Sequence, residues 1–426
     1  MKEMKLQKII SKLQNLHPKE IDLSLNRIKN LCKKLGNPQN NLKCISVVGT
    51  NGKFSTIQAL FSILKESKIN SNIYTSPHIQ KINERFVYNN NKIDDKDLID
   101  LLEEVESINN GEEITYFEIL TAAYFYKASK FKNNINLIES GLFHRFDATN
   151  ILKNNLASII TPIGMDHLDW LPRDERTIDK IIFEKTSKLL NSKIIISKQP
   201  DENVMNKIKK NIEQNRSKKI VFNESFSYNL SENNFFYYED SFGGLKLPIP
   251  SLKGEFQLSN VATAIATLRH INELEVTNNN IIKGIKKINI IARLQEIKNG
   301  NLKNLVKKNK LYLDGSHNPL GAEVLVDFFE KEISNKHLII GMMLNKNHEE
   351  YISYFKNKVK SITTIDIPNQ KNSIKGIDLK QKIKIIDKVS YAGTIEKALK
   401  FLDLKKNDII IITGSLYLAG EILNQN

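Results

Sequence analysis

The residues best suited to chemistry stand in one short stretch, Gly49-Thr50-Asn51-Gly52-Lys53-Phe54-Ser55-Thr56. An apolar, β-branched run over residues 44–48 precedes it, and a helical pattern of apolar residues follows it. A strand, a glycine-containing loop, a lysine, a hydroxyl and a helix are the parts of a phosphate-binding loop. Backbone N–H groups and the helix N-terminus then face the anion, and the lysine neutralises charge on its outer phosphates. A hydroxyl in the first helical turn can hold Mg²⁺.

This loop differs from the usual G-x-x-x-x-G-K-[ST] pattern. Val47 stands at the position of the first glycine, and Phe54 separates Lys53 from Ser55. The simpler alternative is an ordinary turn between a strand and a helix that contains Asn-Gly. The complete string G-T-N-G-K-x-S-T directly after a strand favours the phosphate site.

Other polar residues follow predicted strands. Ser76-Pro77-His78 follows a strand at 72–75, with Asn83-Glu84-Arg85 close behind, and a doubly wound sheet places its ligands at such strand ends. Glu139 closes the buried-type strand 135–139 and is a candidate Mg²⁺ ligand, although a strand-terminal glutamate is as often simply solvated. His167 follows the strand 156–163, and a lone loop histidine usually makes only a hydrogen bond.

Two helical positions have a purely structural interpretation beside the functional one. Thr115-x-x-Glu118 opens a helix as a capping box, which satisfies backbone donors without any function. Lys185 lies in the predicted helix 177–190, and its position alone indicates a surface lysine. Further helices are predicted over residues 1–42 and 94–108, and an Ala-rich helix ends near Leu274.

The second half repeats a strand–helix rhythm, with near-continuous apolar strands at 311–313, 337–340, 362–365 and 408–413. Such strands are typical of a mainly parallel sheet buried on both faces. Polar clusters follow the first strand, at Asp314 to Pro319, and the last, at Gly414-Ser415. The segment 289–296 marks the expected boundary, and we expect the smaller domain to face the nucleotide across a cleft. The predicted fold is therefore α/β, with a P-loop NTPase-like central domain over residues 1–290 and a smaller Rossmann-like C-terminal domain over 291–426.

Composition narrows the function classes. The 426 residues are enough for two domains, and 40% hydrophobic with 26% charged residues is typical of a globular protein. Residues 1–16 alternate lysine with apolar residues and no apolar run reaches membrane-spanning length, so we expect no signal peptide and no membrane partner. Cys32 and Cys44 give no metal or disulfide pattern, which favours a cytoplasmic location.

The net charge of +15 permits three interpretations. The lysines are not gathered in one block and no aromatic residues are interleaved with them, so a nucleic-acid partner is not expected. Two interpretations remain: attraction of small anionic substrates, and a general abundance of lysine along the whole chain. The general abundance explains most of the charge.

The motifs, taken together and in order, resemble the folylpolyglutamate synthase / dihydrofolate synthase family of the Mur ligase superfamily. The resemblance covers nearly the whole chain. It rests on G-T-N-G-K-x-S, S-P-H, T-x-F-E, G-x-x-x-R-x-D-A-T-N, D-H, E-K, Q-x-x-N, D-x-x-H-N-P and G-S-L-Y-L-x-G-E. Any one of these motifs is weak, and their order is what makes the series specific.

The resemblance implies an ATP-dependent ligase. In this chemistry ATP phosphorylates a carboxylate of the pteroate or folate, and the amine of L-glutamate attacks the acyl phosphate to form an amide. The L-H-P-K-x-I-D stretch and T-Y-F-E resemble the bifunctional bacterial enzymes. Both the dihydrofolate synthase and the folylpolyglutamate synthase activity are therefore predicted. We expect a monomer that binds only small-molecule substrates.

The resemblance also implies roles for individual residues. The ATP phosphates would contact Thr50, Asn51, Gly52, Lys53 and Ser55, and the rest of the nucleotide Asn260, Arg293, Asp314 and Ser415. The Mg²⁺ ligands would be Ser76, Glu139 and His167. Lys185 would be carbamylated, and together with Lys53 and His317 it would be catalytic. The pteroate would bind Ile21, Asp22, Arg85, Thr115, Tyr116, Phe117, Glu118, Phe146, Asp147 and Ala148.

The chain departs from the family pattern at several positions. Phe143 and His144 replace two glycines, and Phe54 replaces the third glycine of the phosphate loop. A glycine that the backbone needs for positive φ would be missed there. Phe256, Ala292 and Ser187 replace a histidine and two further glycines. The pteroate pocket is the part that these changes touch most.

Two alternatives compete with this prediction. A Mur ligase acting on a UDP-sugar carries a whole domain before the phosphate loop, and only 48 residues precede Gly49. A nucleotide-binding protein without catalysis has no need of the series Lys53, Glu139, His167 and Lys185. Salt-sensitive retention on DNA would separate a nucleic-acid binder from both.

Overall fold

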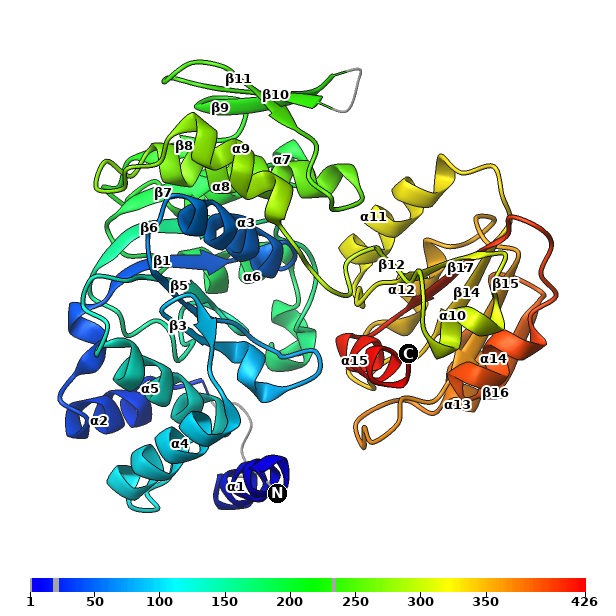
Figure 1. Ribbon diagram of the computed structural model, residues 1–426, viewed down its shortest axis with the longest axis horizontal. Coiled ribbons are helices and arrows are strands. Elements are labelled where there is room, and N and C mark those ends of the chain that lie inside the picture. The colour runs from blue at the N-terminus through cyan, green and yellow to red at the C-terminus, as the bar shows by residue number, and fades with distance from the viewer. Residues whose placement is uncertain (1, 18–22, 232–234) are drawn as a thin grey trace. The chain divides into compact units, whose positions relative to one another are not determined.

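The computed structural model describes residues 2–17, 23–231 and 235–426. The chain divides into two compact units, shown with the chain coloured by residue number in Figure 1. Unit 1 comprises Met1–Ile163, Thr177–Ile249 and Leu258–Ile288, and unit 2 comprises Gly164–Arg176, Pro250–Gln257 and Asn289–Asn426. The domain boundary at residue 290 stays a prediction. Two short segments that precede residue 290 also belong to unit 2.

The described part of unit 1 is built on an eight-stranded sheet in the order β4-β3-β2-β5-β1-β6-β7-β8. β1 lies between β5 and β6 and runs parallel to both, while β3 pairs antiparallel with β2 and β4. The strands are β1 Lys43–Val48, β2 Ser71–Tyr74, β3 Phe86–Tyr88, β4 Asn91–Lys92, β5 Ile135–Glu139, β6 Asn155–Ile160, β7 Lys193–Ile196 and β8 Lys219–Val221. Their parallel arrangement brings the ends of β1, β2, β5 and β6 to one edge of the sheet.

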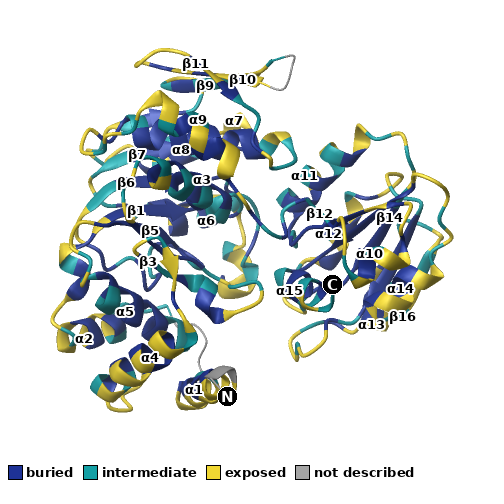
Figure 2. Ribbon diagram, viewed as in Figure 1, coloured by how far each residue is buried: buried dark blue, intermediate teal, exposed yellow. Residues whose placement is uncertain are grey.

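Helices bury the faces of this sheet. Cys44, Ile45, Val47 and Val48 of β1 are at most 2% exposed, which explains their continuous apolar pattern. Figure 1 shows α3 beside α9. The buried apolar residues of α1, α2, α4 and α5 form one cluster with Cys44 and Tyr74. Figure 2 shows buried stretches along the ribbons of these helices. The helices of this unit are α1 Lys2–Leu16, α2 Asn26–Lys34, α3 Lys53–Glu66, α4 Asp95–Asn109, α5 Tyr116–Ala128, α6 Ile178–Thr186, α7 Glu202–Asn211, α8 Glu255–Arg269 from Leu258 onward, and α9 Asn278–Lys287, with 3₁₀ turns at Pro38–Asn41 and Ile82–Arg85.

A small antiparallel sheet belongs to the same unit. Its order is β11-β10-β9, with β9 Phe226–Leu230, β10 Phe235–Asp240 and β11 Leu245–Pro248. Alternate residues of β10 are buried and exposed, as in a sheet with one face toward solvent. β11 contacts α9.

The described part of unit 2 holds a six-stranded sheet in the order β12-β13-β17-β14-β15-β16. All neighbours run parallel except β12 and β13. The strands are β12 Gln295–Glu296, β13 Lys310–Leu313, β14 Lys336–Ile340, β15 Ser361–Ile365, β16 Val389–Gly393 and β17 Ile409–Thr413; the helices are α10 Asn301–Leu305, α11 Pro319–Glu330, α12 His348–Ser353, α13 Gly376–Lys382, α14 Ile395–Phe401 and α15 Leu416–Gln425. Short 3₁₀ turns lie at Leu168–Trp170 and Arg173–Glu175.

The predicted α/β class with mainly parallel sheets is confirmed, and three details are corrected. The strand predicted over 156–163 ends at Ile160. The N–H of Thr161 still donates to Val48 O, but Pro162 has no N–H with which to extend the pairing. The helix predicted to end near Leu274 ends at Arg269. β16 was not predicted, because this edge strand is half exposed and lacks an apolar run. Within residues 2–17, 23–231 and 235–426, no helix is both long and apolar enough to cross a membrane.

Candidate functional site

The loop between β1 and α3 has a shape that only glycine permits at two positions. Gly49 has φ 151°, and a Cβ there would lie 2.1 Å from Thr161 Oγ1. Gly52 has φ 82°, and a Cβ there would lie 2.5 Å from Asn260 Oδ1. Gly52 is also the N-cap of α3, where no side chain caps the helix. A tight glycine loop that leads into an uncapped helix N-terminus is suited to an anion.

Lys53 is folded back over this loop. Its Nζ donates to Gly49 O at 3.2 Å and to Thr50 O at 3.1 Å, and it lies 3.9 Å from Glu139 Oε1. The lysine side chain is 11% exposed, so its charge is directed into the loop and away from bulk water. Ser55 is buried in the first turn of α3. Thr50 and Asn51 hold the loop to the end of β6, because both backbone N–H groups donate to Pro162 O.

Glu139 and Ser76 meet at the same edge of the sheet. Glu139 pairs with Val47 across β1 and β5, so its carboxylate stands beside the phosphate loop. Ser76, just past β2, donates its N–H to Glu139 Oε2 at 3.2 Å. A buried carboxylate, a serine hydroxyl and a neighbouring lysine are groups that suit a divalent cation shared with a triphosphate. In the described residues, no group of three or more His, Cys, Asp or Glu side chains is arranged to hold a metal ion.

Lys185 is buried, although its position in the sequence indicated a surface residue. It is 1% exposed, and its Nζ donates to Gly49 O and to Leu142 O, both at 3.0 Å. The Phe143 ring lies 5.5 Å from the same nitrogen. Lys185 therefore joins the phosphate loop to the loop that follows β5.

Hydrogen bonds within the chain hold the loop after β5. Asp147 accepts from the N–H groups of Gly141 and Leu142 and from the hydroxyl of Thr149. Burial raises the pKa of Asp147, and these hydrogen bonds oppose the rise. Asp147 thus shapes the backbone beside the predicted pteroate site, and direct contact with a substrate stays a prediction. Phe146 stacks on Arg145, and Ala148 is buried.

Arg145 docks the same loop on α6. Its guanidinium forms two hydrogen bonds with Glu184, at 2.7 Å and 2.6 Å, and its N–H donates to Glu184 O. Because Glu184 directly precedes Lys185, this clamp fixes the helix end that carries the buried lysine.

The start of α5 confirms the predicted capping box. Thr115 Oγ1 accepts from Glu118 N, and Glu118 Oε2 accepts from Thr115 N at 2.8 Å. Arg27 also binds the Glu118 carboxylate, at 3.0 Å. Glu118 therefore has a structural role, and its predicted contact with the pteroate is untested. Tyr116 and Phe117 are half-buried, with Phe117 against Gly141.

Arg85 is the last residue of the 3₁₀ turn before β3, and its charge acts on Tyr116. Burial raises the pKa of Tyr116, and the Arg85 charge opposes that rise. Arg85 Nε donates to His78 Nδ1 at 3.0 Å, and burial together with the Arg85 charge lowers the pKa of His78 to about 3. Ile21 and Asp22, also predicted here, lie outside the described residues.

Unit 2 holds a second group of predicted residues at the ends of β13 and β17. Asp314 accepts from the N–H groups of Leu294 and Ser316, at 2.8 Å and 2.7 Å, so both of its oxygens shape the local backbone. Arg293 Nη1 donates to Ala292 O at 3.1 Å. Ser415 is the N-cap of α15 and accepts from Tyr417 N.

His317 and His167 both face Asp166 within unit 2. His317 Nδ1 donates to Gly315 O at 2.9 Å, which leaves Nε2 toward Asp166 Oδ2 at 3.8 Å. His167 has φ 60°, and its Nε2 also lies 3.8 Å from Asp166 Oδ2. Burial lowers the pKa of His317 to about 4, with Lys346 acting in the same direction and Asp166 opposing it.

Sequence reasoning included Asp166 in the D-H motif without giving it a role, and it did not mention Lys346. Lys346 Nζ donates to Asp166 Oδ1 at 2.8 Å, and Asn318 donates to Asp166 Oδ2 at 3.1 Å. Burial alone would raise the pKa of Asp166, but the charges of His167, Lys346 and His317 hold it well below its usual range. Asn345-Lys346-Asn347 carries no recognisable pattern, so only the fold reveals this ion pair.

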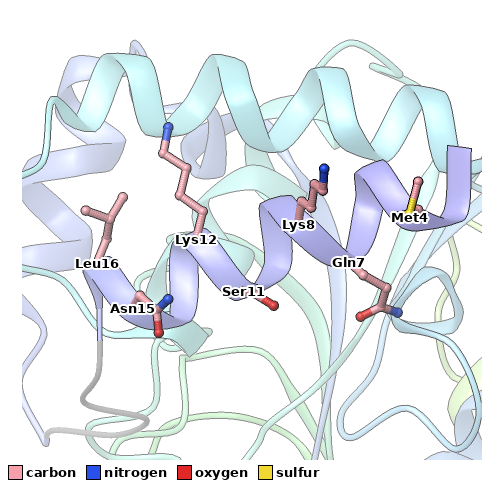
Figure 3. Close-up of a pocket in the computed structure, with 7 residues that line it drawn as sticks. All are labelled: Met4, Gln7, Lys8, Ser11, Lys12, Asn15 and Leu16. Atoms are coloured by element: carbon pink, nitrogen blue, oxygen red, sulfur yellow. The ribbon is translucent and has the colours of Figure 1, made fainter. Parts of the chain in front are cut away.

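The hollows described in the structure lie away from these residues. One of about 590 Å³ runs along α1, lined by Met4, Gln7, Lys8, Ser11, Lys12, Asn15 and Leu16 (Figure 3). Another of about 300 Å³ lies near Asn41, Phe131 and Asn136. Neither contains a predicted site residue, so the glycine loop and its charged neighbours, rather than cavity size, identify the candidate site.

Comparison with known proteins decides the family. A dihydrofolate synthase/folylpolyglutamate synthase from Buchnera aphidicola subsp. Acyrthosiphon pisum (strain APS) is 30% identical over 420 residues, which cover 97% of this chain and 96% of that protein. This chain belongs to the dihydrofolate synthase/folylpolyglutamate synthase family. The protein of the same name from Bacillus subtilis (strain 168) is 28% identical and covers 93% of this chain, with 94% of its own length matched.

Further comparisons agree with this family. Residues 300–416 match the family described as Mur ligase, glutamate ligase domain. Escherichia coli FolC in complex with DHPP and ADP superposes with a TM-score of 0.85 at 24% identity, covering 98% of this chain and 97% of that one. Mycobacterium tuberculosis folylpolyglutamate synthase complexed with ADP and AMPPCP superposes with a TM-score of 0.87 at 21% identity, covering 100% of this chain and 98% of that one. A Yersinia pestis bifunctional folylpolyglutamate synthase/dihydrofolate synthase complexed with AMPPNP and a Mn ion superposes with a TM-score of 0.85 at 23% identity, covering 98% of this chain and 97% of that one. These structures show that the fold is shared.

The structure explains how this member of the dihydrofolate synthase/folylpolyglutamate synthase family accommodates its replaced glycines. Phe143 and His144 do not have positive φ, so their backbone does not need glycine. Both side chains are buried, and His144 contacts Ser140 Oγ at 3.0 Å. Ala292 does have positive φ, at 54°, and is strained relative to glycine. Phe256 is partly buried against the core of unit 2.

Proposed function

We propose that this chain is an ATP-dependent ligase that joins L-glutamate to dihydropteroate, to a reduced folate, or to both, through an acyl phosphate. The observation that carries the proposal is the pairing of Lys53 with Glu139 over a loop that requires glycine at two positions. That arrangement provides a cation for a triphosphate and, 3.9 Å away, a carboxylate suited to its metal ion. Family membership supplies the substrate class.

The proposed reaction has two steps. A carboxylate oxygen of the acceptor attacks the γ-phosphorus of ATP, the bond to the β–γ bridging oxygen breaks, and ADP leaves. The amine of glutamate then attacks the acyl carbon, the bond from that carbon to the phosphate oxygen breaks, and phosphate leaves. Phosphorylation makes a poor acyl donor reactive, and positioning with charge neutralisation provides most of the catalysis.

This chain's own residues have defined parts in the scheme. Lys53 and the backbone N–H groups at the uncapped N-terminus of α3 bind the outer phosphates, and Asn260, which packs against Gly52, helps to define the loop. Mg²⁺, when bound, would neutralise phosphate charge, and Glu139, Ser76 and His167 are the proposed ligands. Asn260, Arg293, Asp314 and Ser415 are proposed to hold the remainder of the nucleotide.

His317 is proposed to accept a proton from the incoming amine. The Gly315 carbonyl can only accept a hydrogen bond, so Nδ1 of a neutral His317 carries its hydrogen and Nε2 carries a lone pair. With a pKa of about 4, His317 is neutral near pH 7 and available as a base. Asp166 lies close enough to stabilise the imidazolium that forms.

Carbamylation of Lys185 stays a prediction. As an amine, its nitrogen donates to Gly49 O and Leu142 O, both at 3.0 Å, and so braces the phosphate loop. No step of the scheme above uses a carbamate.

We further propose residues 1–290 as the ATP-binding domain, residues 291–426 as the ligase domain, a monomeric state and a cytoplasmic location. Both cysteines are buried free thiols, consistent with a reducing compartment.

The decisive experiment is phosphate release with and without each substrate. Purified protein should release phosphate only when ATP, Mg²⁺, glutamate and a pteroate are present together. Dihydropteroate and tetrahydrofolate, tested side by side with product mass measured, distinguish a single activity from both. Equal turnover without glutamate would indicate another amine acceptor or a plain ATPase.

A further inference from the structure

The loop that joins β2 to β3 is fixed from within. Thr75 N–H donates to Arg85 O at 3.3 Å and closes the loop where the two strands meet. Inside it, the Glu84 carboxylate accepts the N–H groups of Ile79, Gln80 and Lys81, at 2.8 Å, 3.1 Å and 2.9 Å. A loop held at its base and around one carboxylate can carry side chains in defined positions.

His78 and Arg85 pair through their side chains within this loop. Arg85 Nε donates to His78 Nδ1 at 3.0 Å. An arginine cannot accept a hydrogen bond, so Nδ1 carries a lone pair and the ring hydrogen is on Nε2. The contact fixes the rotation of the guanidinium plane through its Nε edge. The end of the guanidinium with Nη1 and Nη2 can still bind a carboxylate through two parallel hydrogen bonds.

The positive charge of Arg85 also points to an anionic ligand. Arg85 is half-buried, and among residues 2–17, 23–231 and 235–426 it forms no ion pair with an aspartate or glutamate. Its partner His78 is a neutral ring. A partly desolvated cation beside a neutral group has no opposite charge to offset its lost hydration. An anionic ligand would supply that charge.

The surroundings of Arg85 indicate which anion would bind. Ser76, two residues before His78, binds Glu139 beside the phosphate loop. The Arg85 charge also acts on Tyr116 at the start of α5. The loop thus reaches the phosphate site through Ser76 and brings the guanidinium near the helix proposed to contact the pteroate.

We propose that His78 is a positioning residue that holds Arg85 so that its outer edge binds a carboxylate of the pteroate or folate acceptor. The inference rests on the proposed function, because it takes the acceptor from it. Arg85 touches the substrate, and His78 acts through Arg85.

Equilibrium binding of dihydropteroate tests this without requiring turnover. His78→Leu removes the acceptor for Arg85 Nε and should weaken dihydropteroate binding about tenfold, the usual effect of losing a hydrogen bond to a charged group. His78→Asn places an oxygen near the position of Nδ1 and should restore most of the affinity. ATP binding should change less than twofold in both variants. In a double-mutant cycle, His78→Leu should add little to Arg85→Lys, because lysine has no Nε–H.

A control is His270→Leu, since His270 is another histidine of unit 1, is buried, and bonds Ala266 O through its Nδ1. It should leave dihydropteroate affinity unchanged. Wild-type affinity in His78→Leu, failure of His78→Asn to recover, or a loss of ATP affinity equal to that of dihydropteroate would overturn the positioning role while the ligase assignment stands. Wild-type protein that binds ATP but no pteroate or folate would overturn both.

Discussion

Lys53 Nζ lies 3.9 Å from Glu139 Oε1, although 86 positions separate the two residues in the chain. Two neighbouring parallel strands bring them together: Lys53 begins the helix after β1, and Glu139 ends β5, in register with Val47. A cation and a carboxylate at one sheet edge allow a triphosphate and its metal ion to bind side by side. The proposed ligase function depends on this pair.

Replacing Lys53 should remove most of the activity. Lys53→Met keeps the length of the side chain but loses the charge, so kcat for ADP release should fall by about 10²–10³, the effect of losing one preorganised charge contact. Lys65→Met is the control, because Lys65 is an exposed residue of the same helix. A wild-type rate in Lys53→Met would remove the lysine from the mechanism.

A comparison of two glycines with the same φ distinguishes the cost of backbone strain from an effect on ATP binding. Gly52 and Gly36 both have φ 82°, but a Cβ meets Asn260 Oδ1 at 2.5 Å only at Gly52. Both alanine variants should lose about 1–2 kcal/mol of unfolding free energy, the penalty of left-handed backbone. Gly52→Ala alone should also raise KM for ATP. Denaturant titration and initial rates measure the two effects, and an equal KM in both variants would contradict the role of the loop.

Ala292 provides a site where glycine should stabilise the protein. Its φ of 54° costs alanine about 1–2 kcal/mol relative to glycine. Part of that gain is lost to the greater freedom of glycine in the unfolded chain, so Ala292→Gly should stabilise by about 0.5–1 kcal/mol. Ala322→Gly, inside α11, should destabilise instead. Guanidinium unfolding measures both, and a loss of stability in Ala292→Gly would show that φ is not strained.

The pH dependence of stability should reflect His144. Burial lowers the pKa of His144 from 6.5 to about 4, with the Lys185 charge acting in the same direction. Between these values the unfolded chain binds a proton that the folded chain does not, so stability is complete above pH 6.5 and falls as pH drops toward 4. The expected loss is about 3 kcal/mol. His144→Gln should reduce this slope in urea titrations across that range, whereas an unchanged slope would assign the loss to other groups.

Carbamylation of Lys185 can be tested directly. Protein equilibrated with ¹³C-bicarbonate should show a carbamate carbon signal that disappears in Lys185→Met. Lys185→Met should also lower unfolding free energy by about 1–3 kcal/mol, because Gly49 O and Leu142 O lose their donor. Absence of a signal specific to Lys185 would contradict the modification that family resemblance implies.

The local order of the chain was readable from the sequence. Strand 135–139, the helix after Lys53 and the Thr115–Glu118 capping box follow from residue patterns within a few positions, and all three are confirmed. Near-continuous apolar strands also predicted parallel sheets. These features depend on short-range backbone preferences and on whether one or both faces of a sheet are buried. Both leave a pattern in the order of apolar and polar residues along the chain.

Other properties depend on contacts between distant segments. Lys185 has the pattern of a surface residue, yet it is buried because two loops, from β1 and β5, close over it. Asp147 has the pattern of a site residue, yet its oxygens bind its own loop. The ion pair of Asp166 with Lys346 joins residues 180 positions apart, and no periodicity encodes it. Sequence alone determined which residues could do chemistry; the tertiary structure decided which of them meet, because hydrogen-bond partners and burial are set by chain segments that the pattern does not relate.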